Sequence, residues 1–211
     1  MTKSARYTFS DSQLQSGFID DFRRWEAEDR GRLPLREAIL CVGSSTMRLW
    51  KHMEEDLGPG LVINRGFGGS KMADALPFGR FFARYEAHKV VIYEGDNDLG
   101  DGDMAPETLL AQYRDFCAAI WDHRGDTQIY IISIKPSPCR WPLRDLYLQA
   151  NGLLAALCAS DERLTYINIE PVMLGADGTP IPALFRVDKL HMKRLGYTLW
   201  RDVIRPVLLP H

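Results

Sequence analysis

The sequence predicts a three-layer α/β/α sandwich built around a central, mainly parallel five-stranded sheet. Short apolar runs alternate along the chain with longer amphipathic segments, which is the order expected of an α/β fold. The apolar runs are nearly continuous, as in strands that are buried on both faces of a parallel sheet. No repeat or Pro/Ser-rich linker divides the chain, so we expect a single domain over residues 1–211, with residues 1–35 as an N-terminal helical extension packed on it.

Each element is assigned from its composition and spacing. The expected strands are short, apolar and rich in β-branched residues; they cover 38–42, 61–64, 90–93, 128–134 and 164–169. The expected helices have apolar residues at helical spacing; they cover 11–29, 47–57, 73–87, 106–122, 142–159 and 193–208. Ligands of such sheets bind at the carboxyl ends of the strands, so we expect the functional site at those ends.

Charge and composition argue against several classes of protein. The net charge is −2, with 26 basic and 28 acidic residues, and no Lys/Arg run suggests a surface for nucleic acid or anionic membrane. No apolar stretch is long enough to span a membrane, and the N-terminus has no signal-peptide pattern, so we expect a cytoplasmic protein. The cysteines form no CxxC pair and are expected to be buried free thiols; they are Cys41, Cys117, Cys139 and Cys158.

Four polar or glycine-rich segments lie where chemistry is expected. Residues 43–46 (GSST), 65–70 (RGFGGS) and 94–98 (EGDND) follow the first three strands, and residues 187–191 (VDKLH) precede the last helix. Each segment alone is typical of a helix cap, a turn or a surface pair. Their common placement on one edge of the sheet favours a site over four unrelated turns.

These segments contain the groups that hydrolytic acyl transfer needs. The reaction requires a hydroxyl nucleophile, an imidazole base, a carboxylate that orients the imidazole, and donors for the oxyanion. A serine at a strand-to-helix turn supplies the hydroxyl, and Asp188 and His191 are close enough in sequence to pair within one turn. A glycine N–H of the second segment and the Asn97 amide complete an anion pocket.

Together, the four segments resemble the SGNH hydrolases, also called the GDSL esterase/lipase family, over residues 39 to about 199. The resemblance implies a flavodoxin-like sandwich and identifies Ser45 as the nucleophile. It implies Asp188 and His191 as the other triad members. The oxyanion hole would consist of the Ser45 and Gly69 N–H groups and the Asn97 side chain.

The first segment departs from the literal GDSL pattern. Ser44 stands where many family members have aspartate, and we expect it to be a turn or packing residue, although its hydroxyl remains an alternative nucleophile. Asp96 is expected to be solvated, and Asp98 to cap or brace its loop. The nucleophile elbow of α/β-hydrolases, GxSxG, is excluded because Met47 stands at the second glycine position.

The resemblance implies a serine esterase that cleaves esters of small or soluble substrates without metal or organic cofactor. Phe67, Arg140 and Trp141 are the expected substrate-binding residues. A carbohydrate O-deacetylase, a lysophospholipase or thioesterase, and a non-catalytic ligand-binding α/β domain remain alternatives. A phosphoesterase would need more cations at the site than Arg65. Periodicity does not decide whether residues 11–29 cap the core or form a homo-oligomer.

Overall fold

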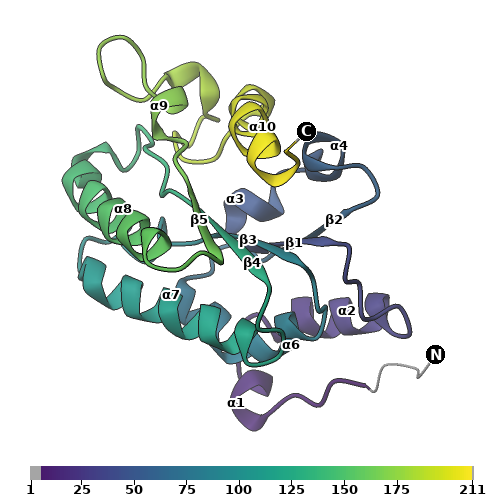
Figure 1. Ribbon diagram of the computed structural model, residues 1–211. Helices are drawn as coiled ribbons and strands as arrows, with labels where there is room; N and C mark the ends of the chain where they lie inside the picture. Colours follow the sequence, from purple (N-terminus) through teal and green to yellow (C-terminus); the bar gives the residue numbers. More distant parts are fainter. Residues whose placement is uncertain (1–5, 211) are drawn as a thin grey trace.

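The computed structural model describes residues 6–210 and contains one parallel five-stranded sheet in the order β2-β1-β3-β4-β5 (Figure 1). The predicted fold class is therefore confirmed. All four strand pairings are parallel. The strands are β1 (Ile39–Gly43), β2 (Val62–Gly66), β3 (Lys89–Tyr93), β4 (Gln128–Ile132) and β5 (Leu164–Ile167).

The helices include four long ones and several single turns. The longer helices are α2 (Ile19–Asp29), α7 (Pro106–Trp121), α8 (Arg144–Ala159) and α10 (Arg194–Leu208). The short helices are α1 (Asp11–Leu14), α3 (Ser45–Arg48), α4 (Met53–Leu57), α5 (Met72–Ala75), α6 (Gly79–Ala83) and α9 (Glu170–Met173). Three 3₁₀ turns accompany them: η1 (Leu76–Phe78), η2 (Trp141–Leu143) and η3 (Pro182–Leu184).

Three of the expected helices are broken into shorter pieces. The segment 11–29 forms α1 and α2, the segment 47–57 continues as α4 after the short α3, and the segment 73–87 forms α5, η1 and α6. Pro77 explains the last break because proline has no N–H group to donate and its ring crowds the preceding turn. The continuous helices predicted there were wrong.

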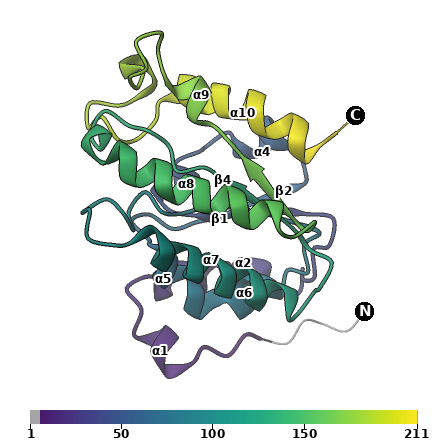
Figure 2. The same cartoon turned by 60° about the vertical axis from the view of Figure 1, so that its left-hand side comes forward.

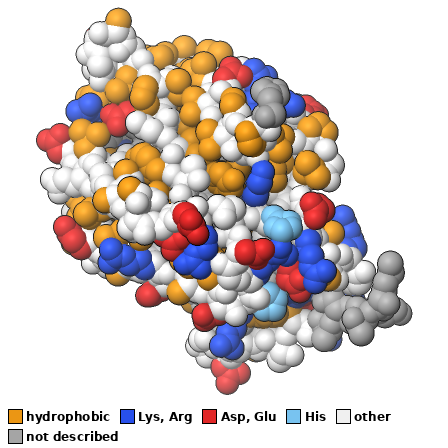
Figure 3. Space-filling model, in the orientation of Figure 1, with side chains coloured by type: hydrophobic (Ala, Val, Ile, Leu, Met, Phe, Trp, Pro, Cys, Tyr) orange, Lys and Arg blue, Asp and Glu red, His pale blue; other side chains and the backbone are white. Residues whose placement is uncertain are grey.

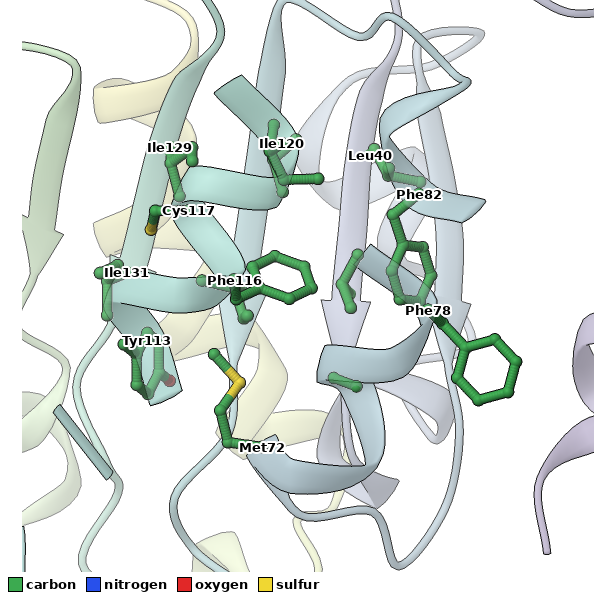
Figure 4. Close-up of a cluster of buried hydrophobic side chains, with 14 of the residues drawn as sticks. Leu40, Met72, Phe78, Phe82, Tyr113, Phe116, Cys117, Ile120, Ile129 and Ile131 are labelled. Carbon is green, nitrogen blue, oxygen red and sulfur yellow. The ribbon is translucent and has the colours of Figure 1, made fainter. Parts of the chain in front are cut away.

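Helices cover both faces of the sheet (Figure 2), and one hydrophobic cluster lies against each face. One cluster packs α2, α5, α6, α7 and α8 against the sheet, and Figure 4 shows part of it, with Phe78, Phe82 and Phe116 among the labelled side chains. The other packs α3, α4, α9 and α10 against the opposite face. Phe22 of α2 is fully buried, and its ring stacks on Phe78 with 3.5 Å between centroids, so the N-terminal helix contributes to the core.

The register of the strands places the ends of β1, β2 and β3 at the same level of the sheet. Gly43 at the end of β1 lies between Gly66 of β2 and Tyr93 of β3. The Phe67 N–H donates to the Gly43 carbonyl at 2.8 Å. At Gly66 a Cβ atom would lie 2.4 Å from the Arg48 backbone nitrogen, so only glycine lets α3 approach the end of β2 this closely. The loops after β1, β2 and β3 consequently leave the sheet side by side.

The distribution of surface charge agrees with the sequence-based expectation, but the burial of the cysteines agrees only in part. In Figure 3 acidic and basic side chains are interspersed on the face shown. Between residues 6 and 210, no helix has the length and apolar character needed to cross a membrane. All four cysteines are free, and three are buried as expected, but Cys139 is exposed on the loop that follows β4.

Candidate active site

Ser45 and His191 are brought together from opposite ends of the chain. Ser45 is the first residue of α3, two residues after the end of β1. Its Oγ atom lies 3.0 Å from Nε2 of His191, which belongs to the loop before α10. Ser44 precedes it as the N-cap residue and is only 1% exposed, whereas Ser45 is half-buried. Of the two serines, Ser45 is the one that contacts an imidazole.

Asp188 holds the other nitrogen of the same imidazole. Its Oδ2 lies 2.8 Å from His191 Nδ1, and its Oδ1 accepts the backbone N–H groups of Leu190 and His191, each at 2.9 Å. Partial burial opposes ionisation, but these two N–H groups and the His191 ring outweigh it and lower the Asp188 pKa to about 2. An ionised Asp188 accepts from Nδ1–H, so Nε2 carries no hydrogen and faces Ser45 Oγ as an acceptor.

The loop that carries Asp188 and His191 is closed by backbone hydrogen bonds. Arg186 N–H donates to the His191 carbonyl at 2.8 Å, and Cys139 N–H donates to the Lys189 carbonyl at 3.0 Å. Lys189 has a positive φ of 57°, a conformation that non-glycine residues rarely adopt. The loop after β4 therefore braces the turn that presents the imidazole.

The expected oxyanion donors come from the three neighbouring loops. The Ser45 and Gly69 N–H groups donate no backbone hydrogen bond within residues 6–210. Gly69 has φ of +88°, which glycine adopts readily. Asn97 Nδ2 donates one hydrogen to the Ser70 carbonyl at 2.9 Å and keeps a second. Hydrogen-bond donors of this kind, on loops at one edge of the sheet, suit the charge that develops on a carbonyl oxygen.

Buried carboxyl groups tie the second and third loops together. Asp98 accepts the Met72 N–H at 2.7 Å through Oδ1 and the Gly95 N–H at 2.9 Å through Oδ2, which gives it the bracing position expected from the sequence. Glu94 accepts the Ser70 hydroxyl at 2.6 Å and is fully buried. Burial raises the pKa of Glu94 well above its ordinary value, although the Ser70 bond opposes the shift. Its Oε2 has no hydrogen-bond partner in the described part of the chain.

Glu94 gives a prediction about the pH dependence of stability. The folded protein keeps the Glu94 proton to a higher pH than the unfolded chain, which loses it near the ordinary glutamate pKa of about 4.3. The free energy of unfolding therefore falls as pH rises between that value and the raised folded pKa, by up to about 1.4 kcal/mol per pH unit. Glu94→Gln keeps the shape and an acceptor for Ser70, so it should remove this slope.

The measurement is urea unfolding of wild type and Glu94→Gln at intervals between about pH 5 and about pH 9. The wild type should lose more stability than the variant over this interval. Subtracting the free energy of unfolding of the variant from that of the wild type at each pH cancels the contributions of the titrating groups that the two proteins share. Parallel pH profiles would contradict the assignment of a proton to Glu94.

The structure does not place the expected substrate residues as a group. Phe67 is fully buried among aromatic rings of the core, with Phe22 at 5.4 Å between centroids, so it does not line a site. The Arg140 guanidinium is directed at Asp96 and Asn97 and is engaged by protein groups. Trp141 is half-buried and is the first residue of η2, the 3₁₀ turn that follows the loop after β4. The prediction that Phe67 lines the substrate pocket is therefore wrong, because its aromatic ring is buried in the hydrophobic core.

Sequence reasoning missed the buried charges beneath the third loop. Asp96 is only 4% exposed, contrary to the solvated position expected, and it pairs with Lys135, which is 1% exposed. Burial alone would raise the Asp96 pKa, but the charges of Lys135 and Arg140 outweigh it and lower that pKa. A lysine directly after an apolar strand was the available signal, because a buried lysine requires a nearby carboxylate.

Two other ligand chemistries receive no support from the described residues. Within residues 6–210, no group of three or more His, Cys, Asp or Glu side chains is arranged to hold a metal ion. Arg65 donates to both oxygens of Asp29, at 2.8 and 2.7 Å, and to the Tyr85 hydroxyl at 2.8 Å. The Arg65 guanidinium is therefore bound by Asp29 and Tyr85 and is not placed to bind a phosphate.

A model of the GDSL-like lipase/acylhydrolase family matches residues 37–199, which include all four segments of the site. The chain belongs to this family. The human platelet-activating factor acetylhydrolase IB subunit alpha1 is 24% identical over 195 residues, covering 89% of this chain and 81% of that protein.

Solved structures share the fold. A Streptococcus pneumonia protein superimposes with a TM-score of 0.78 at 17% identity, covering 90% of this chain and 92% of that one. A GDSL-like lipase from Bacteroides thetaiotaomicron superimposes with a TM-score of 0.71 at 18% identity, covering 89% of this chain and 96% of that one.

Proposed function

We propose that this chain is a serine esterase that hydrolyses short-acyl carboxylic esters through an acyl-enzyme on Ser45. Membership of an acylhydrolase family supports ester hydrolysis. The observation that carries the finer proposal is the hydrogen-bonded row of Ser45, His191 and Asp188, with 3.0 and 2.8 Å between the paired atoms. This is the arrangement that activates a serine hydroxyl in hydrolases of unrelated folds.

The proposed reaction has two halves. His191 Nε2 takes the hydroxyl proton as Ser45 Oγ bonds to the ester carbonyl carbon, and the Ser45 and Gly69 N–H groups and the Asn97 amide stabilise the oxyanion. The imidazolium, held by Asp188, then protonates the departing alcohol as the bond to the ester oxygen breaks. In the second half, His191 deprotonates a water that attacks the acyl carbon, and Ser45 leaves with the proton.

The exposure of the triad supports a short acyl group. The His191 side chain is 27% exposed and that of Asp188 is 46% exposed, so the reacting groups face solvent. Val187, beside them, is 100% exposed and offers no enclosed apolar wall. The name of the human relative, an acetylhydrolase, supports the same acyl size.

Acyl preference is tested with a series of p-nitrophenyl esters from acetate to dodecanoate. An apolar channel would contribute about 0.8 kcal/mol for each buried methylene, which is close to a fourfold rise in kcat/KM per methylene. We expect hydrolysis of acetate and butyrate and no such rise for longer chains. A steep rise with chain length would contradict the short-acyl proposal, and absence of hydrolysis of every ester would favour the non-catalytic binding domain.

A further inference from the structure

The Asn97 side chain is held at both ends of its amide. Its Oδ1 accepts from Arg140 Nη1 at 3.3 Å and from Arg140 Nη2 at 3.2 Å. Its Nδ2 donates to the Ser70 carbonyl at 2.9 Å. Because a guanidinium can only donate and a carbonyl can only accept, these partners permit one orientation of the amide and exclude the flipped one.

That orientation matters for the chemistry proposed above. With Oδ1 turned toward Arg140, the second hydrogen of Nδ2 is available to a developing oxyanion. In the flipped amide the Asn97 oxygen would take the place of that donor and would repel a negative charge. The pair formed with Ser70 also links the amide to the loop that carries Gly69.

Arg140 is itself fixed by a buried ion cluster. Its Nη1 donates to the Asp96 carbonyl oxygen at 2.5 Å and to Asp96 Oδ1 at 2.6 Å. Tyr147 donates to the same two oxygens at 3.0 and 3.1 Å, and Lys135 Nζ pairs with Asp96 Oδ2. A Cβ atom at Gly100 would lie 2.7 Å from the Arg140 guanidinium carbon, so glycine leaves the space that this group occupies.

The cluster also carries a net charge. One carboxylate, Asp96, faces the two cations Lys135 and Arg140, so one positive charge is not neutralised within the cluster. The Asp96 and Lys135 side chains are 5% and 1% exposed, where water screens charge poorly. Arg140 contacts Asn97 Oδ1, so a positive charge lies at the oxygen end of this amide.

We propose that Arg140 is a positioning residue that fixes the Asn97 amide with its N–H directed at the oxyanion. This inference rests on the proposed function and replaces the expectation that Arg140 binds substrate. It requires that Arg140 acts through Asn97, and a double-mutant cycle measures that dependence.

The cycle uses Arg140→Met, Asn97→Ala and the double variant, with kcat and KM measured on p-nitrophenyl acetate. Asn97→Ala should lower kcat by about 10²–10³-fold, as loss of one oxyanion donor does. Arg140→Met should lower kcat by about 10-fold or more with KM nearly unchanged. In the double variant, loss of Arg140 should cost no more than about threefold beyond Asn97→Ala, because the amide that it orients is gone.

Two outcomes would overturn the inference. If Arg140→Met raises KM and leaves kcat unchanged, Arg140 binds substrate. If the two losses multiply in the double variant, Arg140 acts independently of Asn97. A wild type without esterase activity would instead defeat the proposed function itself, so the two failures are distinguishable.

Control variants separate this role from general stability. Arg163→Met removes another arginine–aspartate pair, with Asp161 at 2.6 Å, at the amino end of β5, and should change neither kcat nor KM. Thermal unfolding of each variant checks the fold. If Arg140→Met does not fold, Arg140→Lys keeps a cation opposite Asp96 but lacks the fork that reaches Asn97, and it should give the same non-additive loss of kcat.

Discussion

Replacement of Ser45 by alanine is expected to lower kcat on p-nitrophenyl acetate by about 10⁴-fold or more. The variant loses the hydroxyl that lies 3.0 Å from His191 Nε2, so no acyl-enzyme can form. Binding of substrate is affected less, because the oxyanion donors on neighbouring loops are retained. Initial rates over a range of ester concentrations separate kcat from KM.

The matched control is Ser44→Ala, one residue earlier in the same turn. Ser44 is 1% exposed, and its side chain makes no capping hydrogen bond to α3. We expect this variant to keep most of the activity. Loss of activity in Ser44→Ala together with its retention in Ser45→Ala would assign the reaction to the other hydroxyl.

Asp188→Asn is expected to lower kcat by about 10⁴-fold while leaving the fold intact. The asparagine Oδ1 can still accept the N–H groups of Leu190 and His191, which Asp188 Oδ1 accepts at 2.9 Å. Its amide nitrogen, however, stands where Oδ2 accepts from His191 Nδ1 and can only donate. The ring must then carry its hydrogen on Nε2, and it can no longer take the Ser45 proton.

Steady-state kinetics and thermal unfolding of Asp188→Asn are measured beside Asp177→Asn. Asp177 also accepts a nearby backbone N–H, from Thr179 at 3.0 Å, but it has no histidine partner. The control should keep full activity. Equal activity of wild type and Asp188→Asn would refute the role of Asp188 in selecting the tautomer.

The sheet and the placement of the site could be predicted because their signals are local. Five apolar runs mark the strands, and parallel strands necessarily place their following loops on one edge. Ser45 and His191 are 146 residues apart in sequence. Their proximity followed from resemblance to the family and from the order of the segments, since no periodicity links such distant positions.

The details that depend on tertiary packing could not be predicted. Phe67 lies beside the glycines of the second segment, but its side chain packs against aromatic rings of the core. Asp96 lies in a polar loop, and its burial becomes visible only when Lys135 and Arg140 are brought to it from the loop after β4. Partners more than 35 residues away in sequence contribute to both outcomes.

The central claim, that Ser45 is the nucleophile, is tested most directly by covalent trapping. Wild-type protein is treated with diisopropyl fluorophosphate, which phosphorylates activated serine hydroxyls, and the modified residue is located by tandem mass spectrometry of the digest. We expect one adduct, on Ser45, and none when His191 is replaced by alanine. An adduct on Ser44 or another serine, or no adduct in a preparation that hydrolyses esters, would contradict the account.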